Sequence, residues 1–131
     1  MSLIAATIVK SSGGYAQEIE AGGHHLTADE PTSNGGTNTG PAPYALLLAA
    51  LGACTSITLR MYADRKGWAL GEIHVSLRHE KNAEGADRIA REIRFGAPLT
   101  DEQRTKLAEI AEKTPVTKTV KAGATIDTHI A

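Results

Sequence analysis

The most reactive side chain in the sequence is its single cysteine, Cys54. A thiol attacks electrophiles as the thiolate, which forms readily beside a cation, a base or a helix N-terminus. One cysteine cannot form an intrachain disulfide, a CxxC redox pair or a cysteine-based zinc site. The sequence taken locally leaves two interpretations open, a small buried hydrophobic residue or a reactive lone thiol.

Two other short motifs do not complete a known site. Thr55 and Ser56 follow the cysteine, but neither lies in the G-x-S-x-G turn of a serine hydrolase. Gly35 and Gly40 have the spacing of a phosphate-binding loop, yet Pro41 stands where that motif has lysine. We therefore expect a turn-rich loop there rather than a nucleotide site.

Charge and histidine placement argue against several partner classes. The chain has 14 Lys+Arg against 15 Asp+Glu, a net charge of -1, so neither nucleic acid nor an anionic membrane is an expected partner. No histidine pair has the helical spacing of a metal site, so surface histidines are favoured over a site assembled from distant ones. We expect no metal and no cofactor. The histidines are His24, His25, His74, His79 and His129.

The first half of the chain is predicted to form a small sheet, a loop and a long helix. Residues 3–10, 15–20 and 24–28 are short and separated by glycine pairs, which favours an antiparallel meander. Turn-forming residues fill 29–43. Residues 43–66 have helical apolar spacing and end before a glycine.

The second half is predicted to add a hairpin, helices and a last strand. Residues 71–79 and 87–95 alternate apolar and polar side chains, as strands with one solvated face do. A capping box begins a helix at Thr100, and a short helix follows from Pro115 to about Lys121. Residues 124–130 alternate again and are predicted as a strand. Because strands and helices are segregated, we expect one α+β domain over 1–131.

The long helix carries two further expectations. Every side chain from Tyr44 to Cys54 is apolar or small, so all sides need cover, and a second copy is expected to supply part of it as a homodimer. Gly52 within the helix predicts close approach by another helix or a ligand. Spacings of three and four place one row on a single face of this helix, which comprises Leu47, Leu51, Cys54, Thr58 and Met61.

The sequence also bears on localisation. The most apolar window, 44–54, is shorter than the ~20 residues that a membrane-spanning helix needs. The N-terminal segment lacks the layout of a secretory signal. We therefore expect a cytoplasmic protein that does not span a membrane.

Several stretches together resemble the OsmC/Ohr family, named for osmotically induced and organic hydroperoxide resistance proteins. The resemblance spans essentially the whole chain and is most specific around the cysteine. The stretches are GPAPYALLLAALGACT (40–55), MYADRKG (61–67), RIAREI (88–93), EQRTKL (102–107) and PV (115–116).

The resemblance implies an α+β fold with antiparallel sheets, a long central helix and an intertwined homodimer. It also implies a thiol-dependent hydroperoxide reductase of the oxidative-stress response, related in chemistry to peroxiredoxins. In such enzymes a helix cysteine, here matching Cys54, is oxidised by the peroxide to a sulfenic acid. A second cysteine then forms a disulfide with it, while an arginine and a glutamate hold the first thiol as thiolate.

Three of those four positions differ in this chain. The Cys-Pro motif of the second cysteine reads Thr114-Pro115, and the glutamate's place after Pro43 is taken by Tyr44. The arginine belongs in the N-terminal strands, but the first arginine here is Arg60. Cys54 would therefore need an external thiol reductant, and a substitute cation is sought among Arg60, Lys113 and Lys118.

Three hypotheses follow from the resemblance and its departures. The first is a one-cysteine hydroperoxide reductase that uses Cys54 and an external thiol. The second is a non-catalytic protein of this fold that binds a small apolar ligand at the dimer seam. The third is a single-thiol redox sensor without turnover. The predicted substrate or ligand pocket comprises Tyr44, Ala45, Leu47, Leu51, Met61 and Thr114.

Overall fold

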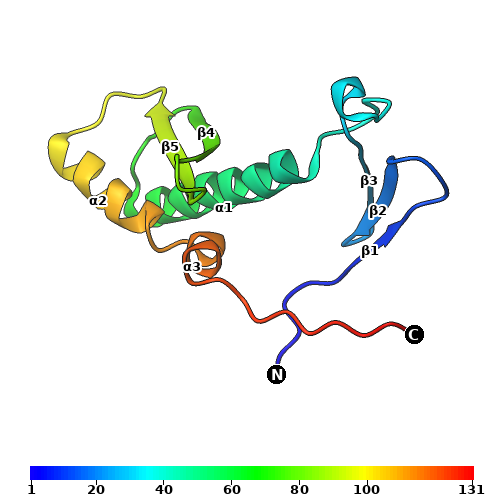
Figure 1. The fold of residues 1–131 in the computed structure, drawn as a ribbon. Helices are drawn as coiled ribbons and strands as arrows, with labels where there is room; N and C mark the ends of the chain where they lie inside the picture. The colour runs from blue at the N-terminus through cyan, green and yellow to red at the C-terminus, as the bar shows by residue number, and fades with distance from the viewer. The chain divides into compact units, whose positions relative to one another are not determined.

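The computed structural model describes residues 1–131, which form two compact units, 1–47 and 48–131. Along the chain, a three-stranded antiparallel sheet precedes a long helix, a two-stranded antiparallel sheet and two short helices (Figure 1). The predicted α+β class is therefore confirmed. We describe each unit by itself.

The sheet of the first unit is a meander of β1 (Thr7–Lys10), β2 (Gln17–Ala21) and β3 (His24–Ala28). Its register places Val9 opposite Ile19 and Ile19 opposite Leu26, so apolar side chains line up across all three strands. The predicted meander is confirmed, although its first strand begins later than residue 3.

The loop after β3 is organised by the buried carboxylate of Asp29, with a short 3-10 turn η1 (Thr32–Asn34) inside it. The Thr37 and Thr39 hydroxyls donate to Asp29 Oδ2 at 2.6 and 2.8 Å, and both backbone N–H groups donate to the same oxygen. The Glu30 N–H donates to Oδ1 at 2.7 Å. These donors, the Thr37 hydroxyl foremost, hold the pKa of Asp29 well below its usual range.

Two glycines of this loop permit close backbone contacts. A Cβ on Gly36 would lie 2.0 Å from the Glu30 carbonyl oxygen, and one on Gly40 would lie 2.1 Å from that of Thr27. Only a residue without a side chain fits at such distances. Both glycines are therefore explained by the packing of the loop itself.

Helix α1 (Pro43–Lys66) has the predicted bounds, with proline in its first turn and Gly67 after it at φ 69°. Its buried face repeats every four residues through Leu51, Thr55, Leu59 and Ala63. Of the row that shares one face in the sequence, only Leu51 is buried in the single chain. The buried face lies to one side of that row because the hairpin and the next helix pack on the side of Leu59.

Gly52 lies where a strand, rather than another helix or a ligand, approaches α1. A Cβ at this position would lie 2.8 Å from Cδ1 of Leu77 in the hairpin. The expected close approach is observed, and within the single chain it comes from a strand side chain.

Helix α1 is also long and apolar enough to cross a membrane by length and composition alone. Its mean hydropathy is 1.5 over an 18-residue window, of which 17% is buried in the single chain. The apolar stretch thus runs further than the 44–54 window. One such helix is a weak indication, because core helices of soluble proteins pass the same test.

In the second unit, β4 (Ile73–Lys81) and β5 (Asp87–Phe95) form the predicted hairpin. Half-buried and exposed residues alternate along β4 and along β5 from Ile89 to Phe95, so one face of the hairpin turns inward. This face contributes Ile73, Ile93 and Phe95 to the margin of the core.

Helices α2 (Asp101–Ala111) and α3 (Pro115–Ala122) complete the second unit. The capping box at Thr100 is confirmed, since its hydroxyl accepts from the Gln103 N–H while the Gln103 side chain accepts from the Thr100 N–H. The core joins α2 to α1 and consists of Leu59, Ala63, Leu70, Leu107 and Ala111.

The predicted C-terminal strand is wrong for the single chain. Residues 124–130 follow α3 without forming a strand, and Ile126 and Ile130 are 85% and 91% exposed. A strand requires a neighbouring strand for its backbone hydrogen bonds. The alternating pattern alone does not supply that neighbour.

Candidate functional site

Cys54 lies in the middle of α1 as a free, half-buried thiol. It belongs to a row of α1 residues spaced alternately three and four apart, which we name the α1 seam. The seam consists of Leu47, Ala50, Cys54, Ile57 and Met61. Leu47, Ile57 and Met61 are 41%, 59% and 57% exposed in the single chain, so the thiol lies on an apolar surface.

Thr55, the residue after the cysteine, faces inward and is fully buried. Its hydroxyl donates to the Leu51 carbonyl at 2.7 Å, one helical turn earlier. The same oxygen accepts a hydrogen bond of 2.8 Å from Arg91 Nη1. The turn of α1 that carries Cys54 is thereby attached to strand β5.

Arg91 occupies an inward position of β5, opposite Leu77 in the hairpin register, and its side chain is only 12% exposed. Besides Thr55, Nη1 donates to the Thr117 hydroxyl at 2.9 Å. Nη2 donates to the Ala111 carbonyl at 3.0 Å and to a Glu112 carboxylate oxygen at 2.9 Å. A buried guanidinium is stable only with such partners, because desolvating an unpaired charge is costly.

Thr114, which the sequence resemblance matches to the second cysteine, is fully buried. It is the N-cap of α3, where its hydroxyl accepts from the Thr117 N–H. The two threonine hydroxyls also lie 2.6 Å apart. Thr114 is thus linked through Thr117 to Arg91, and through Arg91 to the residue beside Cys54.

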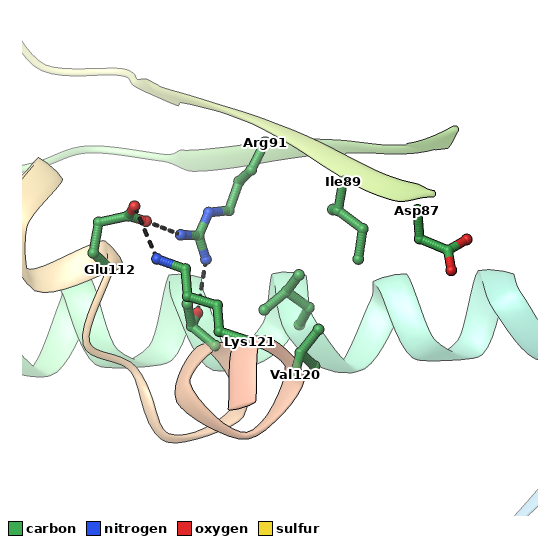
Figure 2. A pocket seen from close by; sticks show the side chains of 8 residues that line it. Asp87, Ile89, Arg91, Glu112, Val120 and Lys121 are labelled. Atoms are coloured by element: carbon green, nitrogen blue, oxygen red, sulfur yellow. Dashed lines mark hydrogen bonds and ion pairs between the residues drawn. The ribbon is translucent and has the colours of Figure 1, made fainter. Parts of the chain in front are cut away.

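A cleft of about 540 Å³ opens beside this network, between α1, β5, the end of α2 and α3 (Figure 2). Its apolar walls are Leu51, Ile89 and Val120, and its polar walls include Arg91, Glu112 and Lys121. The remaining lining residues are Asp87 and Thr117.

The carboxylate of Glu112 links the two cations of the cleft. One oxygen accepts from Lys121 at 3.1 Å and the other from Arg91 at 2.9 Å, as the dashed lines in Figure 2 mark. Lys121, and after it Arg91, hold the pKa of Glu112 below its usual range. The cleft therefore presents a paired cation–anion–cation row beside apolar walls.

The structure divides the predicted pocket residues. Leu51 lines the cleft, and Thr114 is buried in the adjoining hydroxyl network. The others, Tyr44, Ala45, Leu47 and Met61, are exposed on α1 and do not line this cleft.

The cation that adjoins the cysteine turn is one that sequence reasoning missed. Arg60 donates to the Gly71 carbonyl at 2.6 Å, and Lys113 and Lys118 are exposed. Arg91 reaches this turn instead, through its hydrogen bond to Thr55. The available signal was an arginine at an inward position of an alternating strand, since such a residue must find buried partners.

No group of three or more His, Cys, Asp or Glu side chains in the chain is arranged to hold a metal ion. The charged groups of the cleft are already paired, Arg91 and Lys121 with Glu112, and Asp87 with His79 and Lys81 of the hairpin. The one unpaired reactive group of the region is the Cys54 thiol, which has no hydrogen-bond partner in the single chain.

A comparison with known protein families identifies the family to which the chain belongs. The model of the OsmC-like protein family matches residues 36–129, which include the α1 seam, Arg91 and Thr114. The chain belongs to the OsmC-like protein family. No curated protein matches the chain significantly.

Solved structures of OsmC-like proteins share the fold along nearly the whole chain. The organic hydroperoxide resistance protein OsmC of Legionella pneumophila is 19% identical, with TM-score 0.66 and 92% of each chain covered. OhrB of Bacillus subtilis, also an organic hydroperoxide resistance protein, is 23% identical, with TM-score 0.62 and 91% of each chain covered.

A third solved structure, described as an organic hydroperoxide resistance protein from Vibrio cholerae, holds a molecule of captopril in one of its active sites. It is 24% identical, with TM-score 0.64, and the match covers 92% of this chain and 88% of that one. At such identities these similarities establish the shared fold.

Proposed function

We propose that this OsmC-like protein is a one-cysteine hydroperoxide reductase in which Cys54 reacts with the peroxide and an external thiol regenerates it. The observation that carries the proposal is the half-buried free thiol at mid-helix on an apolar surface, in a fold shared with organic hydroperoxide resistance proteins. An apolar surface around the thiol favours organic hydroperoxides over hydrogen peroxide, because their alkyl groups gain from burial.

The reaction balances without a second cysteine in the chain. The Cys54 thiolate attacks one oxygen of the O–O bond, an S–O bond forms, and the other oxygen leaves as alkoxide and takes a proton. The products are a sulfenic acid and an alcohol. One external thiol condenses with the sulfenic acid and releases water, giving a mixed disulfide. A second thiol then displaces Cys54 and leaves as the oxidised disulfide.

The experiment follows Cys54 by intact mass after addition of cumene hydroperoxide, with and without dithiothreitol. We expect one added oxygen without reductant, and many equivalents of peroxide consumed with it. The matched variant is Cys54→Ser, which should lose all turnover. Full activity in Cys54→Ser would rule out the mechanism.

The same measurement separates the two other hypotheses. A single stoichiometric oxidation that dithiothreitol does not convert into turnover supports a redox sensor. A thiol that peroxide leaves unchanged supports a protein that binds an apolar ligand. In that event the pocket built on Tyr44, Ala45, Leu47 and Met61 becomes the region to test by ligand titration.

We further propose that the protein acts as a homodimer in the cytoplasm. The alternate three- and four-residue spacing of the α1 seam is the pattern by which two helices pack along each other. Small residues at Ala50 and Cys54 allow close approach, and the larger apolar residues of the seam are exposed in the single chain. A second copy that covers the seam would bury the surroundings of the thiol.

A further inference from the structure

The buried guanidinium of Arg91 is the group from which a further role can be inferred. It is placed on the inward face of β5, whereas the other two arginines of that strand, Arg88 and Arg94, are exposed, and Arg94 pairs with Glu92. An inward arginine costs desolvation free energy that an apolar residue at the same position would not. The hydrogen bonds that it makes have to offset this cost.

Its four hydrogen bonds reach three other elements around one point. They end on α1 at Thr55, on the last turn of α2 and its cap at Ala111 and Glu112, and on α3 at Thr117. The bond to α1 ends on the residue that directly follows Cys54. Consecutive Cα atoms lie about 3.8 Å apart, so the guanidinium is held within a short distance of the cysteine turn.

The charges around this point sum to a positive value. The groups that face Arg91 are Glu112 at the end of α2 and Lys121 on α3, and these three side chains give two cations and one anion, a net charge of +1. Asp87 also lines the cleft, but it pairs with His79 and Lys81 in the hairpin. From α1 the contact is the uncharged hydroxyl of Thr55.

We infer that Arg91 is a positioning residue for Cys54, which acts through Thr55 to fix the reactive turn of α1 and to keep a positive charge beside the thiolate. This role rests on the proposed function. The charge reaches the site from β5 of the same chain, while the N-terminal strands contain no arginine.

The test measures two reactions of Cys54 in the full-length protein, oxidation by cumene hydroperoxide and alkylation by iodoacetamide. Arg91→Met removes the charge and the hydrogen bonds, and Arg91→Lys keeps the charge but loses the planar fork of donors. We expect Arg91→Met to slow both reactions about five- to tenfold at neutral pH, the size of effect of one unit charge nearby. Its alkylation rate should also rise at higher pH than that of the wild type.

Arg91→Lys should recover part of the lost rate, because the ammonium keeps the charge. Arg94→Met is the matched control, since it removes an exposed arginine from the same strand and should leave both rates unchanged. A merely structural role of Arg91 would lower the melting temperature without moving the pH dependence of alkylation. Wild-type rates in a folded Arg91→Met protein would overturn the inference.

A second variant keeps the test decisive if Arg91→Met does not fold. Thr55→Val has nearly the same shape and removes the link between Arg91 and α1, together with the hydroxyl's bond to the Leu51 carbonyl within the helix. A slower Cys54 in this variant supports the inference and an unchanged one contradicts it. Alkylation requires no peroxide chemistry. A wild-type thiol that is alkylated but never oxidised would therefore refute the proposed function while leaving the role of Arg91 open to measurement.

Discussion

At the scale of single residues, Asp29 shows how one buried carboxylate determines the conformation of a loop. Four of its five hydrogen bonds come from Thr37 and Thr39, eight and ten residues along the chain. A carboxylate that accepts several N–H and O–H donors stays ionised far into the acid range. The conformation of the loop that leads into α1 is thus stabilised by hydrogen bonds to the ionised Asp29 carboxylate.

Asp29→Asn should lower the melting temperature at neutral pH, because the amide offers one acceptor oxygen where the carboxylate offers two. The pKa of Asp29 is lower in the folded protein than in the unfolded chain, so its stabilising effect is complete above the unfolded value and is lost as the pH falls toward the folded one. The gap between wild type and variant should therefore narrow below about pH 4. Melting curves from pH 7 down to about pH 2.5 measure this; a gap that is constant with pH would contradict it.

Cys54 and Arg91 differ in how far the sequence reveals them. A lone cysteine is visible by its residue type. Arg91 becomes significant only through partners 20 to 36 residues away, and no local pattern near it encodes them.

At the scale of elements, α1 has one face buried within the chain and another that is apolar but exposed. Leu59 and Ala63 are fully buried against the hairpin and α2, while the α1 seam turns apolar residues outward. An ordinary amphipathic helix would have polar residues on its outward side. Helix α1 therefore has apolar surface left for a further contact.

Helix α2 begins at a capping box that its own sequence encodes. Thr100→Ala removes the hydroxyl that accepts from the Gln103 N–H, and should cost about 1 kcal/mol of unfolding free energy. Chemical denaturation provides the measurement. Thr105→Ala, at an exposed position of the same helix, is the control and should cost nothing, since alanine favours helices. Equal losses in the two variants would show that the cap is unimportant.

At the scale of the whole molecule, a single chain leaves several apolar side chains in water. Among them are those of the α1 seam and those of the segment after α3, where Ile126 and Ile130 have no strand to pair with. Contiguous exposed apolar surface in a soluble protein usually marks an interface.

Met61→Glu tests whether a second copy covers the seam. The side chain is 57% exposed in the single chain, so a carboxylate there should leave the chain folded. In a helix–helix interface the same carboxylate would be desolvated without a partner, and the dimer should dissociate. Size-exclusion chromatography with light scattering gives the mass directly.

Glu84→Lys, in the turn between β4 and β5, is a charge-changing control that should remain dimeric. A wild-type protein that is monomeric at micromolar concentration would refute the dimer.

The local interactions of this chain were predictable from sequence. The bounds of α1, the capping box at Thr100, the hairpin alternation and the break before α3 all depend on residues within a few positions of one another. Hydrogen bonds and backbone preferences at that range act in the same way in any fold.

Only the tertiary structure decided which side of α1 is buried, why Gly52 is small and what the inward Arg91 binds. Each of these depends on contacts between residues far apart in sequence, such as Gly52 with Leu77 and Thr55 with Arg91. The same reason explains the segment 124–130. Its alternation shows that it could pair as a strand, but a strand forms only where a second strand is in reach.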